Sequence, residues 1–93
     1  MLDPLIAAEI QTVRLKLMAF TDRQSDQPVR SQCLTVDARL AEVLEGDDPI
    51  LRQVLANSVV QLEEALRWAA RSTIEKSIMD FLTGLPLRSV VGD

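Results

Sequence analysis

Apolar residues recur every three or four positions along most of the chain, and polar residues fill the positions between them. Because an α-helix turns once every ~3.6 residues, this spacing gathers the apolar side chains on one side of a helix. The pattern predicts four helices, over residues 4–21, 27–45, 49–71 and 73–83. Thr35 interrupts the second pattern, so that helix begins either at Gln27 or at Thr35.

Residues suited to helix ends stand at the boundaries of these stretches. Asp3-Pro4 and Asp48-Pro49 each pair a carboxylate that can accept a helix N–H with a proline that fits the first turn. Either Ser25 or Asp26 can cap the second helix in the same way. The sequence therefore contains an N-terminal capping signal for three of the four predicted helices.

The apolar row changes direction near Ser72. Beyond this residue the apolar positions form a second row, rotated by roughly 130° from the first. One straight helix cannot keep both rows against the same core, so we predict a kink or a break near Ser72. The alternative is a single straight helix to Thr83, whose end would project beyond its neighbours.

These elements predict an all-α fold, a small antiparallel bundle of three long helices and a short fourth. Residues 1–93 form a single helical domain, and residues 84–93 form a short irregular tail that starts with Gly84. The predicted core comprises fourteen apolar residues: Ile6, Ile10, Val13, Leu17, Phe20, Leu40, Leu44, Leu51, Leu55, Leu62, Leu66, Ile74, Ile78 and Phe81.

Composition narrows the classes of partner. The net charge of −4 and the absence of a basic cluster argue against nucleic acid and against anionic lipid surfaces. No apolar run is long enough to cross a bilayer, and the N-terminus lacks the basic and apolar regions of a signal peptide. A single cysteine fits a reducing compartment, so we expect a cytoplasmic protein.

The chain lacks the side chains that most often carry catalysis. It has no histidine, so it lacks the commonest general base and metal ligand. It also has no phosphate-binding glycine motif. Cys33 lies on the apolar row of its helix and is expected to be buried. We predict no catalytic, cofactor-binding or metal-binding residue.

An acidic cluster surrounds the turn at Gly46 and could in principle hold a hard cation. Such cations bind carboxylate oxygens, but the spacing of a calcium-binding loop is absent. Acidic residues are also common at helix ends, where they cap the backbone and interact favourably with the helix dipole. We therefore assign these four acids to helix ends: Glu42, Glu45, Asp47 and Asp48.

Some large apolar residues fall outside the predicted core. Val60 and Trp68 lie on the polar side of the third helix, and Leu15 and Met18 lie off the apolar row of the first. Each is either covered by another helix of the chain or exposed for a partner. Because tryptophan and arginine are enriched where proteins bind one another, we assign six residues to partner binding. They are Trp68, Val60, Glu64, Arg71, Leu15 and Met18.

The expected function is a non-catalytic protein-interaction module, such as a small cytoplasmic adaptor, chaperone-like or regulatory protein. We expect it to associate with itself as a homodimer. The alternative is a small-ligand binder or enzyme that uses arginine and carboxylates in a pocket between helices. That alternative predicts that Arg39, Arg52 or Arg67 gathers with acidic residues around a cavity.

Overall fold

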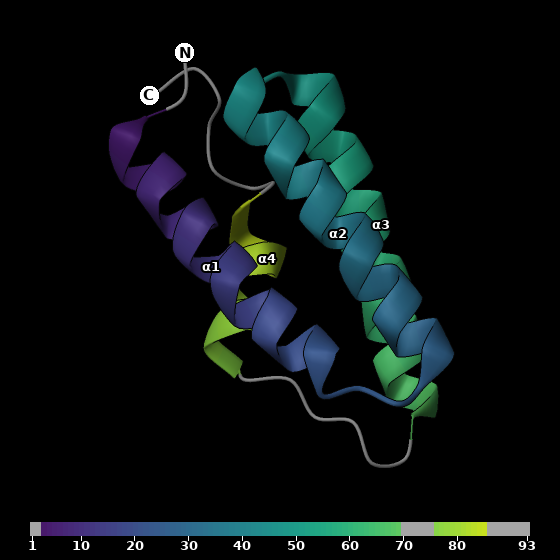
Figure 1. Ribbon diagram of the computed structural model, residues 1–93. Coiled ribbons are helices and arrows are strands. Elements are labelled where there is room, and N and C mark those ends of the chain that lie inside the picture. The colour runs from purple at the N-terminus through teal and green to yellow at the C-terminus, as the bar shows by residue number, and fades with distance from the viewer. Residues whose placement is uncertain (1–2, 70–75, 86–93) are drawn as a thin grey trace.

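The computed structural model describes residues 3–69 and 76–85 of the chain. Within these residues the chain forms the predicted all-α bundle, and consecutive helices run in opposite directions (Figure 1). The helices are α1 (Pro4–Asp22), α2 (Gln27–Glu45), α3 (Pro49–Trp68) and α4 (Lys76–Gly84). The second helix starts at Gln27 and not at Thr35.

The three long helices begin with the same local chemistry. The carboxylate of Asp3 accepts a hydrogen bond from the N–H of Leu5 at 2.8 Å, and Asp48 accepts one from Ile50 at 2.6 Å. Asp26, and not Ser25, caps α2. Each cap satisfies a backbone donor that has no partner within its own helix. The predicted Asp-Pro starts of α1 and α3 are confirmed.

The helices are arranged as a closed ring. The most extensive packing is between α2 and α3, and α1 packs on the other side of α2. The short helix α4 completes the ring, because it contacts both α1 and α3. Figure 1 shows α1 and α2 side by side, with α4 behind them. None of the helices in the described ranges combines the length and apolar character needed to cross a membrane.

The core lies along the axis of this ring. Eight of the predicted core residues are buried: Ile10, Val13, Leu17, Phe20, Leu40, Leu55, Leu62 and Ile78. Five others are only partly buried and pack against its edge, namely Ile6, Leu44, Leu51, Leu66 and Phe81. These five therefore contribute to the core as predicted, but at its periphery. Ile74 lies outside the described residues.

The core also contains residues that the prediction omitted. Valines of α2, the end of α4 and one arginine are fully or almost fully buried: Val29, Val36, Val43, Leu82, Leu85 and Arg52. Leu85 directly follows α4 and is as buried as the central leucines. The fold therefore continues to Leu85, so it includes Gly84 and Leu85, the first two residues of the segment predicted as an irregular tail. Residues 86–93 lie outside the described part.

Helix α3 ends earlier than predicted. Its last residue is Trp68, whereas the prediction placed the end at residue 71. Ala69 leaves the helix with an extended backbone and packs against the core. The chain re-enters a helix at Lys76, so one straight helix from 49 to 83 is excluded. Ser72, where we predicted the kink or break, lies outside the described residues.

Candidate functional site

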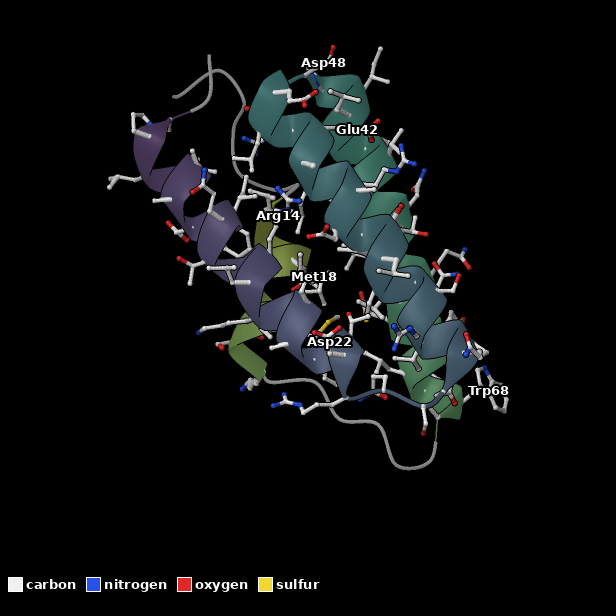
Figure 2. All side chains as sticks on the ribbon, in the orientation of Figure 1. Arg14, Met18, Asp22, Glu42, Asp48 and Trp68 are labelled. Carbon is white, nitrogen blue, oxygen red and sulfur yellow. The ribbon has the colours of Figure 1, made fainter. Side chains whose placement is uncertain are left out.

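The outward side of α3 carries the most exposed aromatic residue. Trp68 is 83% exposed and Val60 is 54% exposed. Val60, Glu64 and Trp68 are four residues apart, so they lie along one side of the helix. Figure 2 shows Trp68 at the end of α3, projecting away from the bundle. We name this surface the α3 edge and define it as Val60, Glu64, Arg67 and Trp68.

The charges beside Trp68 form only a loose pair. Nη1 of Arg67 lies 3.7 Å from Oε2 of Glu64, and both side chains are exposed. An exposed pair of this kind contributes roughly 0–1 kcal/mol to stability. The hypothesis that another helix of the chain covers Trp68 is wrong. The α3 edge therefore presents the large ring of Trp68 beside the charges of Glu64 and Arg67. These two charged side chains can reorient at little cost.

A second surface lies between α1 and α2. Leu15 and Met18 of α1 border a shallow hollow of about 350 Å³, together with Gln11. Arg14 and Asp37 also line it, and Nε of Arg14 lies 2.9 Å from Oδ1 of Asp37. Leu15 is 76% exposed, whereas Met18 is partly buried. Figure 2 shows Arg14 and Met18 between the two helices.

The pair of Arg14 and Asp37 fastens α1 to α2. A second hydrogen bond joins Nη2 of Arg14 to Oδ2 of Asp37 at 3.3 Å, so the guanidinium and the carboxylate meet as two forks. This geometry is stronger and more directional than a single contact. The hydrogen bond that Arg14 donates to Asp37 also raises the pKa of Arg14. The two charges that line the hollow thus neutralise each other.

The predicted partner-binding residues are divided between two places. Leu15 and Met18 lie on α1, whereas Val60, Glu64 and Trp68 lie on α3. Since α1 packs on α2 and α4, the described residues bring no part of α1 against α3. Arg71 lies outside the described residues. The sequence could not separate the two groups, because helical spacing orders residues within a helix but not between helices.

A third surface was not predicted from the sequence. An open groove of about 460 Å³ runs between α1 and α4, with apolar residues that include Val13, Ile78 and Phe81. Glu9 and Lys16 of α1 also line it. Its two walls come from opposite ends of the chain, so no local pattern could have indicated it. It contains none of the predicted site residues.

The arginines proposed for a ligand pocket lie at separate positions. Arg39 pairs with Glu42 one turn away on α2, with Nη1 and Oε1 2.6 Å apart. Arg67 belongs to the α3 edge, and Arg52 is buried. None of the three lines either hollow described above. Within residues 3–69 and 76–85, these three arginines thus do not converge on one cavity as the polar groups of a small-ligand site do.

Arg52 has a structural environment that the sequence did not indicate. Its Nε and Nη2 donate to Oδ1 and Oδ2 of Asp47, each at 2.8 Å. Its Nη1 donates to the backbone carbonyl of Leu85 at 2.9 Å. The hydrogen bonds from Arg52 lower the pKa of Asp47 below its ordinary value. Arg52 therefore ties the turn before α3 to the end of α4.

Three of the four acids at this turn have defined roles. Asp48 caps α3, Asp47 holds Arg52, and Glu42 pairs with Arg39. Cys33 is buried in the core as predicted. Burial raises the pKa of its thiol, and a hydrogen bond with Thr21 opposes part of that rise. A buried, protonated thiol is a poor nucleophile.

Comparison with protein-family models, curated proteins and solved structures finds no match for this chain. The fold defines its class, a small all-α bundle of antiparallel helices. Because many folds of this kind serve unrelated functions, the fold alone carries no activity. Function must therefore be inferred from the chemistry of the α3 edge and of the hollow between α1 and α2.

Proposed function

We propose that the chain is a non-catalytic protein-interaction module that associates with itself through outward apolar side chains. The observation that carries this proposal is that the bundle leaves large apolar side chains exposed on two separate surfaces, with Leu15 beside the hollow between α1 and α2 76% exposed and Trp68 of the α3 edge 83% exposed. Tryptophan is among the residues that contribute most to binding energy at protein interfaces. Val60 of the α3 edge is also more than half exposed.

The free energy available from covering these residues supports the proposal. A tryptophan buries roughly 200 Å² of surface, which corresponds to about 5 kcal/mol when it is removed from water. Covering an exposed leucine such as Leu15 gives about 1–2 kcal/mol. Association has an entropic cost of at least ~4 kcal/mol, so several side chains of one surface, supplied by both copies, must be covered together. Weak, concentration-dependent association is the expected behaviour.

The composition supports a non-catalytic role in the cytoplasm. The chain has no histidine, and its one cysteine is buried. The net charge of −4 disfavours nucleic acid and anionic membranes as partners. A small adaptor, chaperone-like or regulatory protein fits these properties, and it requires no cofactor. Its partner is a protein, in the first instance a second copy of this chain.

Sedimentation equilibrium over a wide concentration range tests the proposal. We expect the mass of the wild-type chain to rise above 10.3 kDa as its concentration increases. The variants Leu15→Ala and Trp68→Ala are compared with Ile50→Ala, which removes an exposed apolar residue from the opposite end of α3. At least one of the first two variants should associate more weakly, with unchanged helical content. A monomer at every concentration contradicts self-association.

A further inference from the structure

The surface between α1 and α2 has the same arrangement on both helices. On α1, Gln11 and Met18 stand three residues before and four residues after Arg14, and Leu15 follows it directly. On α2, Leu34 and Ala41 stand three residues before and four residues after Asp37, and Ala38 follows it directly. Because residues three and four apart share a helix face, each set surrounds its half of the Arg14–Asp37 ion pair. We name these eight residues the α1/α2 face.

The α1/α2 face is electrically neutral. Its two charged residues are hydrogen bonded to each other, and its other six residues are uncharged. The exposed charges of α1 that lie nearest, Glu9 and Lys16, line the groove on the α4 side of the helix. On α2, every exposed residue from Gln27 to Ala38 is uncharged.

The neutrality of the α1/α2 face matters for self-association, because the chain as a whole has a net charge of −4. When two identical copies meet about a two-fold axis, the same patch faces itself, and any unbalanced charge meets its like. Like charges brought together at an interface are strongly unfavourable. The α1/α2 face escapes this repulsion, because each copy supplies as many positive as negative groups. A second copy of the chain is therefore the partner that this face suits.

The two helices that carry the α1/α2 face are large enough for a dimer. Each of α1 and α2 has 19 residues. At ~1.5 Å per residue each helix is about 28 Å long, and two helices side by side are about 20 Å wide. The outer side of the two helices thus offers up to ~560 Å² per copy, with the eight residues of the face in its middle, and two copies together reach the ~1,000 Å² that specific interfaces require. The α3 edge belongs to a single helix and is narrower.

We propose that a second copy docks face to face on the α1/α2 face, about a two-fold axis, with Leu15 and Leu34 as the central apolar contacts. The charged ends of the helices, Asp22 and Glu45, then form a polar rim. Trp68 stays outside this interface, because it projects from α3 (Figure 2). The inference rests on the proposed self-association and assigns it to one surface.

Paired charge variants test the contact. One variant carries Leu15→Glu with Leu34→Glu, and the other carries Leu15→Lys with Leu34→Lys. Leu15 and Leu34 are both exposed in the single chain, so the variants should fold with wild-type helical content. The matched controls are Val60→Glu and Val60→Lys, which place the same charges on the α3 edge. Sedimentation equilibrium gives the dissociation constant of each protein and of their mixtures.

Each double variant should dissociate about 100-fold more readily than the wild type, because like charges then face each other. An equimolar mixture of the two double variants should recover a heterodimer, whichever helices face each other across the axis. The Val60 variants should associate as the wild type does. This set of results supports the α1/α2 face as the dimer interface.

Three results contradict the inference, and they are distinguishable from one another. If the double variants associate as tightly as the wild type, the face is wrong, but self-association stands. If each double variant is monomeric and their equimolar mixture does not form a heterodimer, the loss of the dimer did not come from repulsion across this face. If the wild type is itself a monomer at millimolar concentration, the proposed self-association fails together with the inference.

Discussion

Arg52 and Asp47 form a two-pronged ion pair in which both side chains are almost completely buried, with exposed fractions of 4% and 3%. Both hydrogen bonds are 2.8 Å long. Removing both charges from water is costly, and the pair repays that cost only while both partners are present. The third bond of Arg52, to the carbonyl of Leu85, makes the pair part of the attachment of α4.

Loss of one partner should therefore destabilise the fold strongly. Asp47→Ala leaves the guanidinium of Arg52 buried without its counter-ion, and we expect it to lower the free energy of unfolding by about 3–5 kcal/mol. Urea denaturation measures the change. Glu42→Ala removes the acid of the more exposed Arg39–Glu42 pair and should cost no more than about 1 kcal/mol. Equal effects of the two substitutions would contradict the special role of Asp47.

The Arg52–Asp47 pair should also make the stability of the fold depend on pH in the acid range. Arg52 lowers the pKa of Asp47 in the folded protein, whereas the unfolded chain keeps the ordinary value of about 4. The stabilisation that the Arg52–Asp47 pair gives to the fold is therefore fully present above pH ~4. It is lost as the pH falls through the lowered pKa of Asp47 in the folded protein. Thermal unfolding followed from neutral to acid pH should show this loss in the wild type. Asp47→Asn should flatten that dependence, and an unchanged acid profile would count against it.

The ion pair between Arg14 of α1 and Asp37 of α2 should contribute less to stability than the Arg52–Asp47 pair. Arg14 and Asp37 are only partly buried, so solvent screens their attraction. A double-mutant cycle with Arg14→Ala and Asp37→Ala should give a coupling free energy of about 1 kcal/mol. The matched cycle on Arg67 and Glu64, which lie 3.7 Å apart, should give a value near zero. A coupling near zero at Arg14 and Asp37 would show that the forked geometry adds nothing.

Cys33 should react slowly in the native protein. Its thiol is buried and its pKa is raised by that burial, so little thiolate is available to attack a disulfide reagent. Labelling with such a reagent should therefore depend on transient opening and accelerate many-fold in moderate urea. A tripeptide containing cysteine gives the rate of an accessible thiol. Native labelling at that rate would mean that Cys33 is not protected in solution.

The single tryptophan reports on the two surfaces separately. Trp68 is exposed, so its fluorescence should resemble that of free tryptophan and be quenched efficiently by iodide. If dimers form through the α1/α2 face, neither property should change as the concentration rises. A blue shift with rising concentration would instead place Trp68 in the self-association interface.

Local sequence patterns were sufficient to predict the helices. The caps at Asp3 and Asp48 act on backbone N–H groups two residues away, so short-range spacing contains all the information that they need. The same holds for the apolar rows that became the core. The end of α3 was placed three residues too late, because Ala69 leaves the helix in order to pack against the core. That packing depends on neighbours that helical spacing does not specify.

The surfaces could be predicted only in part, because they combine residues from different helices. Arg14 and Asp37 are 23 positions apart, and Arg52 meets a carbonyl 33 positions away. The burial of Arg52 was missed, since an arginine in an amphipathic helix is expected to face water. For Trp68 the pattern placed the ring on the polar side of α3. Whether another helix covered it was decided only by the packing.

The position of α2 in the ring has a consequence for how the molecule opens. This helix packs on α1 on one side and most extensively on α3 on the other, while α4 is a single nine-residue segment at the far side. Fluctuations that detach α4 break few contacts, so they occur far more often than those that free α2. We therefore expect the backbone amides of α2 to be the last to exchange with solvent. We also expect the hairpin of α2 and α3 to be the most cooperative part of the described fold, with α1 and α4 attached to it.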